Sequence, residues 1–259
     1  MRIDVYLVEN GHCESRNKAA RLIGEGKILL DGKCVIKPSQ DVSDGEHTVE
    51  ITEADKYVGR GGLKLEAALT SFAIDVRGKR CIDVGASTGG FTDCLLQNGA
   101  AFVCAVDSGR GQLHEKLLAD IRVTSVEGYN ARQLTSEEFG CFDVAVMDVS
   151  FISQTLLHQP VASVLKEGAC FISLIKPQFE AGKSALGKGG IVKKAADRAD
   201  AVSRVLQSAA LYGFETVNVI PSPIEGGDGN REYLALFVKK SANEVPCGNQ
   251  IDIKQLCKD

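Results

Sequence analysis

An apolar run leads directly into a glycine-rich turn about a third of the way along this 259-residue chain. Residues 81–84 are Cys-Ile-Asp-Val, residues 85–90 are Gly-Ala-Ser-Thr-Gly-Gly, and an apolar segment that suits a helix follows from Phe91. A strand, a tight turn and a helix in this order form the first unit of a doubly wound α/β sheet. Because such sheets bind ligands at the carboxyl ends of their strands, this turn constrains both the fold and the place of a site.

The turn and a later acid indicate a nucleoside site. Asp107 ends the next apolar segment, about 20 residues after the turn, where a carboxylate can bind an adenosine ribose. The turn is not a dinucleotide fingerprint, because Ser87 stands where that motif has glycine, and no phosphate-loop lysine follows. A site for an adenosine ribose without a pyrophosphate suggests S-adenosylmethionine. The alternative is a tight connection without a ligand.

Bulk properties exclude several classes of protein. The net charge of −4 makes RNA binding a matter of a local patch rather than of the whole chain. The nine cysteines include no C-x-x-C, and their odd number favours a reducing, cytoplasmic location. The four histidines lack the spacing of metal ligands, so we expect no metal. We expect no membrane contact either, since no apolar run approaches 18 residues and no signal peptide is present.

Residues 1–50 are predicted to form a compact α+β unit. Ser15 is a suitable N-cap for a helix over residues 16–23, and Asp31-Gly32 between apolar runs predicts a hairpin of residues 28–30 and 35–36. Residues 16–37 hold six cations and two anions, which suits contact with a phosphate backbone. A solvated helix face is the alternative explanation of this charge.

The rest of the chain alternates between strand and helix patterns, which predicts a mostly parallel sheet with helices on both faces. Residues 51–62 are predicted to be a linker, residues 63–240 the second domain, and residues 241–259 a loose polar tail. Helices are expected at residues 63–69 and 195–211, and the last two strands are expected to form a hairpin. The predicted strands span residues 80–84, 101–106, 122–126, 142–147, 170–175, 216–220 and 233–238.

Three charged residues adjoin predicted strands on the expected ligand side of the sheet. Asp148 follows one apolar strand, Lys176 follows the next, and Glu232 opens the last. A charge at the end of a strand often only marks where the chain meets water. Two acids and a lysine at one rim beside a nucleoside pocket are better explained as a functional cluster.

The first domain resembles the small RNA-binding domain first seen in ribosomal protein S-four. The likeness rests on Arg2-Ile3-Asp4, Ser15-Arg16, Asp31-Gly32 and Lys37-Pro38-Ser39 with the residues between them. It implies contacts with the phosphates and shape of structured RNA. The residues implied to contact RNA are Arg2, Arg16, Lys18, Arg21 and Lys27.

The whole chain resembles the TlyA family, also called the haemolysin A family, of ribosomal RNA ribose methyltransferases. The motifs that carry this likeness are residues 57–65, 83–91, 105–113, 148–153, 176–180 and 229–233. The resemblance implies a Rossmann-like, seven-stranded, FtsJ-like methyltransferase domain. It also implies transfer of a methyl group from S-adenosylmethionine to the 2′-hydroxyl of a cytidine in ribosomal RNA, in the large subunit and, as an open question, in the small subunit.

The resemblance assigns a catalytic tetrad of Lys64, Asp148, Lys176 and Glu232. We expect Lys176 to take or steer the hydroxyl proton, Lys64 to supply a second positive charge, and the two acids to position these groups. Gly59, where the family pattern has serine, is a departure outside the tetrad. The expected S-adenosylmethionine site comprises Asp83, Gly85, Ser87, Gly89, Gly90 and Phe91 around the methionine part, Asp107 on the ribose, and Asn130 on the adenine or as a helix cap.

Other functions remain open at this point. A ribosome-binding assembly factor with an inactive methyltransferase fold would keep the RNA-binding domain, and a pore-forming haemolysin would account for one family name. A small-molecule methyltransferase would leave the first domain without a role. We expect a monomer whose partner is ribosomal RNA within ribosomal subunits.

Overall fold

The computed structural model describes residues 1–43, 45–52, 55–226, 229–241 and 251–258. The chain forms two compact units, Met1–Lys56 and Tyr57–Asp259. The division falls inside the segment expected to be a linker. Tyr57 is buried in a hydrophobic cluster of the second unit, so the second half of that segment packs as part of the larger domain. Each unit is described separately.

The first unit packs two helices against a small sheet with strand order β2-β1-β3. Its core contains the apolar side chains of both helices and of β1, among them Leu7, Leu22 and Ile28. The Ser15 hydroxyl accepts a hydrogen bond from the Lys18 amide, which confirms the predicted N-cap. The elements are α1 (Ile3–Glu9), α2 (Arg16–Gly24), β1 (Ile28–Leu30), β2 (Lys33–Cys34) and β3 (Val49–Ile51).

The predicted hairpin is present but shorter than expected. Asp31 and Gly32 both have positive φ, as a two-residue turn between antiparallel strands requires, and they join β1 to β2. The second strand is Lys33–Cys34 rather than residues 35–36, and Val35, which follows it, packs into the core. The other edge of β1 pairs with β3, which the sequence pattern did not predict.

The second unit contains the predicted seven-stranded sheet, in the order β6-β5-β4-β7-β8-β10-β9. The first five of these strands are parallel, and β10 runs antiparallel to both β8 and β9. The expected hairpin of the last two strands is therefore present. The strands are β4 (Arg80–Val84), β5 (Phe102–Asp107), β6 (Val123–Glu127), β7 (Phe142–Met147), β8 (Leu165–Ile175), β9 (Phe214–Pro221) and β10 (Tyr233–Lys239).

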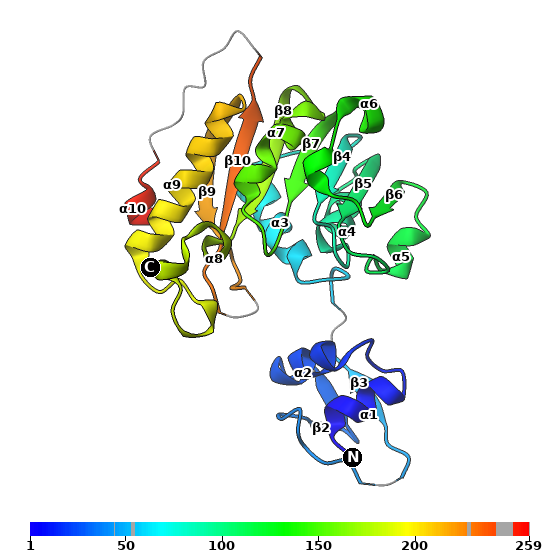
Figure 1. Cartoon of the computed structure of the whole chain (residues 1–259). Helices are drawn as coiled ribbons and strands as arrows, with labels where there is room; N and C mark the ends of the chain where they lie inside the picture. Colours follow the sequence, from blue (N-terminus) through cyan, green and yellow to red (C-terminus); the bar gives the residue numbers. More distant parts are fainter. Residues whose placement is uncertain (44, 53–54, 227–228, 242–250, 259) are drawn as a thin grey trace. The chain divides into compact units, whose positions relative to one another are not determined.

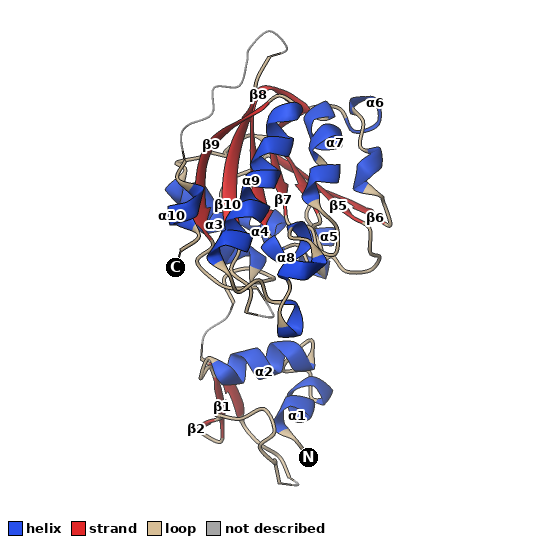
Figure 2. Cartoon of the chain, turned by 60° about the vertical axis from the view of Figure 1, so that its left-hand side comes forward, coloured by secondary structure: helices blue, strands red, loops and turns tan. Residues whose placement is uncertain are grey.

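Helices cover both faces of this sheet (Figures 1 and 2). Successive strand residues face opposite sides, so Ile82 joins the cluster under α7 and α9, whereas Cys81 joins the cluster under α3 and α4. The helices are α3 (Gly61–Ser71), α4 (Gly90–Gln97), α5 (Glu115–Leu118), α6 (Ser136–Phe139), α7 (His158–Ser163), α8 (Pro177–Glu180), α9 (Ala195–Leu211) and α10 (Ile253–Leu256), with 3₁₀ turns η1 (Ala131–Gln133), η2 (Gln154–Leu156), η3 (Lys183–Ala185) and η4 (Lys188–Gly190).

The C-terminal segment differs from the loose tail that we expected. Residues 251–258 pack against α9 through α10, and Cys257 is fully buried. The buried guanidinium of Arg198 donates hydrogen bonds to the Cys257 carbonyl at 2.7 Å and to the Tyr233 hydroxyl at 3.2 Å. Residues 242–250 and 259 of the expected tail lie outside the described part of the chain.

Candidate functional site

Two cavities lie at the carboxyl ends of the parallel strands. The larger has a volume of about 460 Å³ and the smaller about 280 Å³. They adjoin one another, because Gly85, Ser87, Asp148 and Ser150 line both. This is the position at which a doubly wound sheet binds its ligands.

The glycine-rich loop lines both cavities through Gly85 and Ser87. Gly85 has a φ of 86°, and a Cβ atom at this position would lie 2.5 Å from the Asp148 carbonyl oxygen. A Cβ on Gly90 would lie 3.0 Å from the Gly59 carbonyl oxygen. Side chains at these two positions would therefore push neighbouring backbone away, which explains why the loop needs glycine there. Phe91, with Gly90, lines the smaller cavity.

Asp107 joins the loop to the larger cavity. Its carboxylate accepts hydrogen bonds from the Ser87 amide at 2.8 Å and from the Gly109 amide at 2.7 Å. Asn130 lines the same cavity, and its side-chain oxygen accepts a hydrogen bond from the Arg132 amide. Asn130 therefore caps η1 from the wall of the cavity, which confirms the helix-cap alternative, and its contact with the adenine stays a prediction.

Two of the residues expected around the cofactor line neither cavity. Asp83 is fully buried on the face of the sheet that α4 covers, where it accepts a hydrogen bond from the Thr92 hydroxyl at 2.7 Å. Burial raises the pKa of Asp83 to about 7. Gly89 has positive φ and adjoins Leu117, whose side chain a Cβ would overlap. Asp83 lies behind the loop, and Gly89 belongs to the loop but faces Leu117 rather than the cleft.

The four residues of the expected tetrad form two ion pairs. Lys64 on α3 pairs with Glu232, which lies just before β10, and both side chains are buried. The Lys176 ammonium, just after β8, lies 2.5 Å from the Asp148 carboxylate, just after β7. Lys64, Asp148 and Lys176 line the smaller cavity, and Glu232 is joined to it through Lys64. Residues far apart in the chain thus bring two positive and two negative charges to one place.

Sequence reasoning missed several residues of the site. The Ser150 hydroxyl accepts a hydrogen bond from the Lys176 ammonium at 2.8 Å, and Arg60 lines the smaller cavity. Phe151 has a φ of 63°, its side chain is 93% exposed, and its ring lies 5.3 Å from that of Phe179. All of them lie in motifs that carry the family resemblance. Their closeness in sequence to Asp148, Lys176 and Lys64 could therefore have identified them as site residues.

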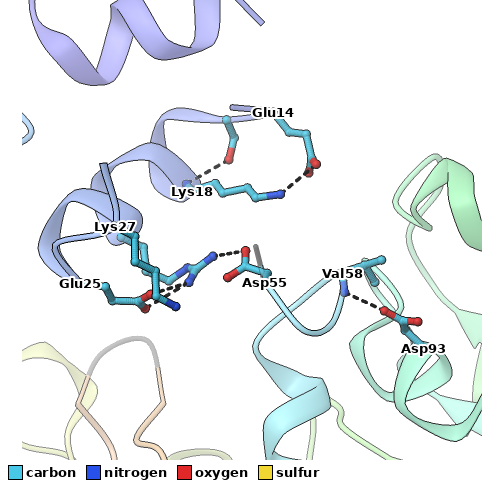
Figure 3. A network of polar contacts seen from close by, with 9 residues as sticks. Glu14, Lys18, Glu25, Lys27, Asp55, Val58 and Asp93 are labelled. Atoms are coloured by element: carbon cyan, nitrogen blue, oxygen red, sulfur yellow. Dashed lines mark hydrogen bonds and ion pairs between the residues drawn. The ribbon is translucent and has the colours of Figure 1, made fainter. Parts of the chain in front are cut away.

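The expected RNA-binding residues of the first unit already have acidic partners. Arg2 and Arg16 both donate to the buried carboxylate of Asp4 and hold its pKa below the usual value. The other pairs in this unit are Lys18 with Glu14, Arg21 with Glu25 and Asp55, and Lys27 with Glu25 (Figure 3). Their side chains remain at least one-fifth exposed, so the pairs orient the cations without burying them.

Two further findings concern metals and membranes. Within the described residues, no three histidine, cysteine or acidic side chains gather closely enough to hold a metal ion. Across that same part of the chain, every helix is too short or too polar to span a bilayer.

The sheet order, the glycine-rich loop and the acid on β5 define the class of Rossmann-like methyltransferases. Residues 57–239 match the FtsJ-like methyltransferase family, and residues 1–47 match the S4 domain. The chain belongs to the TlyA, or hemolysin A, family of FtsJ-like methyltransferases.

Individual relatives cover nearly the whole chain. The "16S/23S rRNA (cytidine-2'-O)-methyltransferase TlyA" of Mycobacterium tuberculosis is 44% identical over 90% of this chain and 88% of its own length. "Hemolysin A" of Brachyspira hyodysenteriae is 42% identical over 92% of this chain and all of its own. A solved structure from Streptococcus thermophilus that carries a hemolysin name is 40% identical, with a TM-score of 0.78 over 99% of this chain and 94% of that one.

Proposed function

We propose that this protein transfers a methyl group from S-adenosylmethionine to the ribose 2′-hydroxyl of a cytidine in ribosomal RNA. The observation that carries the proposal is the pair of lysine–carboxylate contacts beside the glycine-rich loop of an FtsJ-like fold. The activity named for the relatives from Mycobacterium tuberculosis supports the same substrate.

The residues of the cleft suit S-adenosylmethionine. Gly85 and Gly90 line the cleft while neighbouring backbone packs closely against them, and Asp107 lines the larger cavity. We assign Gly85, Ser87, Gly90 and Phe91 to the methionine part, Asp107 to the ribose and Asn130 to the adenine. Asp83 supports the loop from behind, and Gly89 shapes it from within. When bound, S-adenosylmethionine supplies a methyl group that is already activated as a sulfonium. The protein must therefore mainly align the groups that react.

Lys176 is the residue assigned to the proton of the ribose hydroxyl. It lies at the smaller cavity, where Asp148 and Ser150 hold its ammonium group. Lys64 adds a second positive charge beside the place where negative charge would develop on the ribose oxygen, which is the arrangement that stabilises such a charge most. Glu232 and Asp148 oppose loss of the proton electrostatically, so we assign them to positioning the two lysines.

The first unit is assigned to RNA binding through Arg2, Arg16, Lys18, Arg21 and Lys27. Phosphate contacts by such residues position an RNA without reading its bases. The substrate is then ribosomal RNA within ribosomal subunits, with the large subunit as the first expectation. The corresponding location is the cytoplasm.

Mapping of 2′-O-methyl groups tests the proposal. Ribosomal RNA from cells with and without this gene should differ at one or more cytidines, and purified protein should methylate subunits from the cells that lack the gene. Lys176→Ala protein should bind the subunits without methylating them. Binding without methylation by the unmodified protein would instead favour an assembly factor, and methylation of small molecules alone would remove RNA as the substrate.

A liposome assay tests the haemolysin alternative separately. Purified protein added to dye-loaded vesicles should release no more dye than a matched amount of serum albumin. Release that rises with protein concentration would favour a pore-forming activity.

A further inference from the structure

Two segments at the site run alongside each other, and successive residues of one contact successive residues of the other. One is the loop of residues 148–154, after β7, and the other is Lys176 with α8. Lys176 contacts Asp148 and Ser150 at one end of this arrangement. The rings of Phe151 and Phe179 touch in the middle. The far end is closed by the last residue of α8, to which neither the tetrad nor the cofactor site gives a role.

That residue is Glu180, whose carboxylate is buried and uses both of its oxygens. One accepts a hydrogen bond from the Ser153 hydroxyl at 2.6 Å, and the other accepts one from the Gln154 amide at 2.8 Å. Only 6% of Glu180 is exposed, and burial raises the pKa of its carboxyl. A buried carboxylate is expensive unless it is hydrogen-bonded, so both donors are required by the fold.

The partners of Glu180 are themselves fixed. The buried side chain of Gln154 accepts a hydrogen bond from the Ser173 hydroxyl and donates one to the Leu174 carbonyl, both on β8. The Arg204 guanidinium, on α9, donates to the Glu180 backbone carbonyl at 2.5 Å. Glu180 therefore connects the loop end to elements that belong to the core of the domain.

We propose that Glu180 is a positioning residue for methyl transfer. By holding the Ser153-Gln154 end of the loop, its carboxylate keeps Asp148 and Ser150 against the Lys176 ammonium. The predicted effect on the rate of methyl transfer rests on the proposed function. The predicted effect on the position of the loop does not, because it can be measured without any activity.

A second carboxylate provides a matched comparison. Glu127, at the end of β6, accepts hydrogen bonds from the amides of Gly111, Gln112 and Leu113 at 2.6, 2.9 and 3.2 Å. Gln112 lines the larger cavity, on the side assigned to the nucleoside. Glu127 therefore holds a loop on the cofactor side of the cleft, as Glu180 holds one on the catalytic side.

The experiment compares Glu180→Gln with Glu127→Gln in full-length protein. Methyl transfer to ribosomal subunits gives kcat and the KM for S-adenosylmethionine, and calorimetry gives cofactor affinity. A displacement near 1 Å can cost about 100-fold in rate, so Glu180→Gln should lower kcat by about that factor with little change in cofactor KM. Glu127→Gln should mainly raise the cofactor KM. Equal kcat in Glu180→Gln and unmodified protein, both folded, would overturn the inference.

Hydrogen exchange keeps the two proposals separable. Amides of residues 148–154 should exchange faster in Glu180→Gln than in the unmodified protein or Glu127→Gln. Unchanged exchange there overturns the positioning role, whereas absent methyl transfer by the unmodified protein overturns only the proposed function. Ser153→Ala removes one of the two donors and serves if Glu180→Gln does not fold, with the same effects expected at smaller size.

Discussion

Tyr233, the residue after Glu232, pairs with Ile175, the residue before Lys176. Because β10 runs antiparallel to β8, the start of β10 lies at the same sheet edge as the end of β8. A parallel last strand would bring its end, rather than its start, to this edge. The reversed strand thus places Glu232 where Asp148 and Lys176 leave their own strands.

Replacement of Lys176 by Ala should remove most methyl transfer from a folded protein. Loss of a group that handles a proton typically lowers kcat by about 10²–10⁴-fold. Lys166→Ala is a matched control, because Lys166 lies near the start of β8, the strand that precedes Lys176, and pairs with Asp143 at 2.6 Å, away from the cleft. Rates measured with ribosomal subunits should fall for Lys176→Ala alone, and a variant that retains most activity would contradict the assigned role.

Lys64→Met should destabilise the protein as well as inactivate it. Removal of one partner from a buried ion pair leaves Glu232 buried and uncompensated, which costs about 3–5 kcal/mol. The double variant Lys64→Met/Glu232→Leu should regain part of that free energy of unfolding in urea while it remains inactive. A single variant as stable as the unmodified protein would show that the pair contributes nothing to folding.

Gly85→Ala should abolish cofactor binding, whereas Gly78→Ala should not. Both glycines have positive φ, so each substitution carries a backbone penalty of about 1 kcal/mol. Only at Gly85 would the new Cβ meet the Asp148 carbonyl; no atom lies within 4 Å of a Cβ on Gly78. Calorimetry with S-adenosylmethionine separates the two effects, and equal affinity in both variants would refute the steric argument.

Arg16→Ala should weaken RNA binding by loss of a phosphate contact. The slope of log K against log salt concentration should become shallower by about 1. Arg77→Ala is the control, since Arg77 pairs with Asp75 on an exposed part of the second unit. Filter binding to ribosomal subunits over a range of salt gives both slopes. Identical slopes for Arg16→Ala and the unmodified protein would remove Arg16 from the interface.

His158 should make stability fall in mild acid. Burial lowers the pKa of His158 to about 4 from its usual 6.5, so between these values the unfolded state binds the extra proton. The free energy of unfolding should therefore fall as pH drops from 6.5 toward 4, by about 3 kcal/mol in total from this residue. His158→Gln should flatten that part of the curve in urea titrations; the same slope in both proteins would contradict it.

Much of the catalytic domain could be predicted from the sequence because its strands are continuous apolar runs, several of which are followed by a charged residue. The site residues Asp148 and Lys176 stand at such ends, and parallel strands bring those ends together. Glu232 reaches the same edge because β10 is antiparallel to β8. The expected hairpin of the last two strands also implied a reversed last strand.

What periodicity could not reveal are partners that lie far away in the chain. The contacts of Glu180 with Ser153 and Gln154, and of Arg198 with Cys257, depend on tertiary packing. The strand β3 was missed because three residues carry too little alternation to recognise. Asp83 and Gly89 carry the same motif signal as Gly85, and only the fold separates residues that line the cleft from those that support it.

The insertion of β10 between β8 and β9 has a consequence for synthesis. Lys64 is translated 168 residues before Glu232. In a nascent chain that has emerged only as far as β8, Lys64 therefore has no Glu232 to pair with. The edge of β8 that later pairs with β10 is also still unpaired. The ion pair between Lys64 and Glu232 can therefore form only after the start of β10 has been synthesised and has left the exit tunnel.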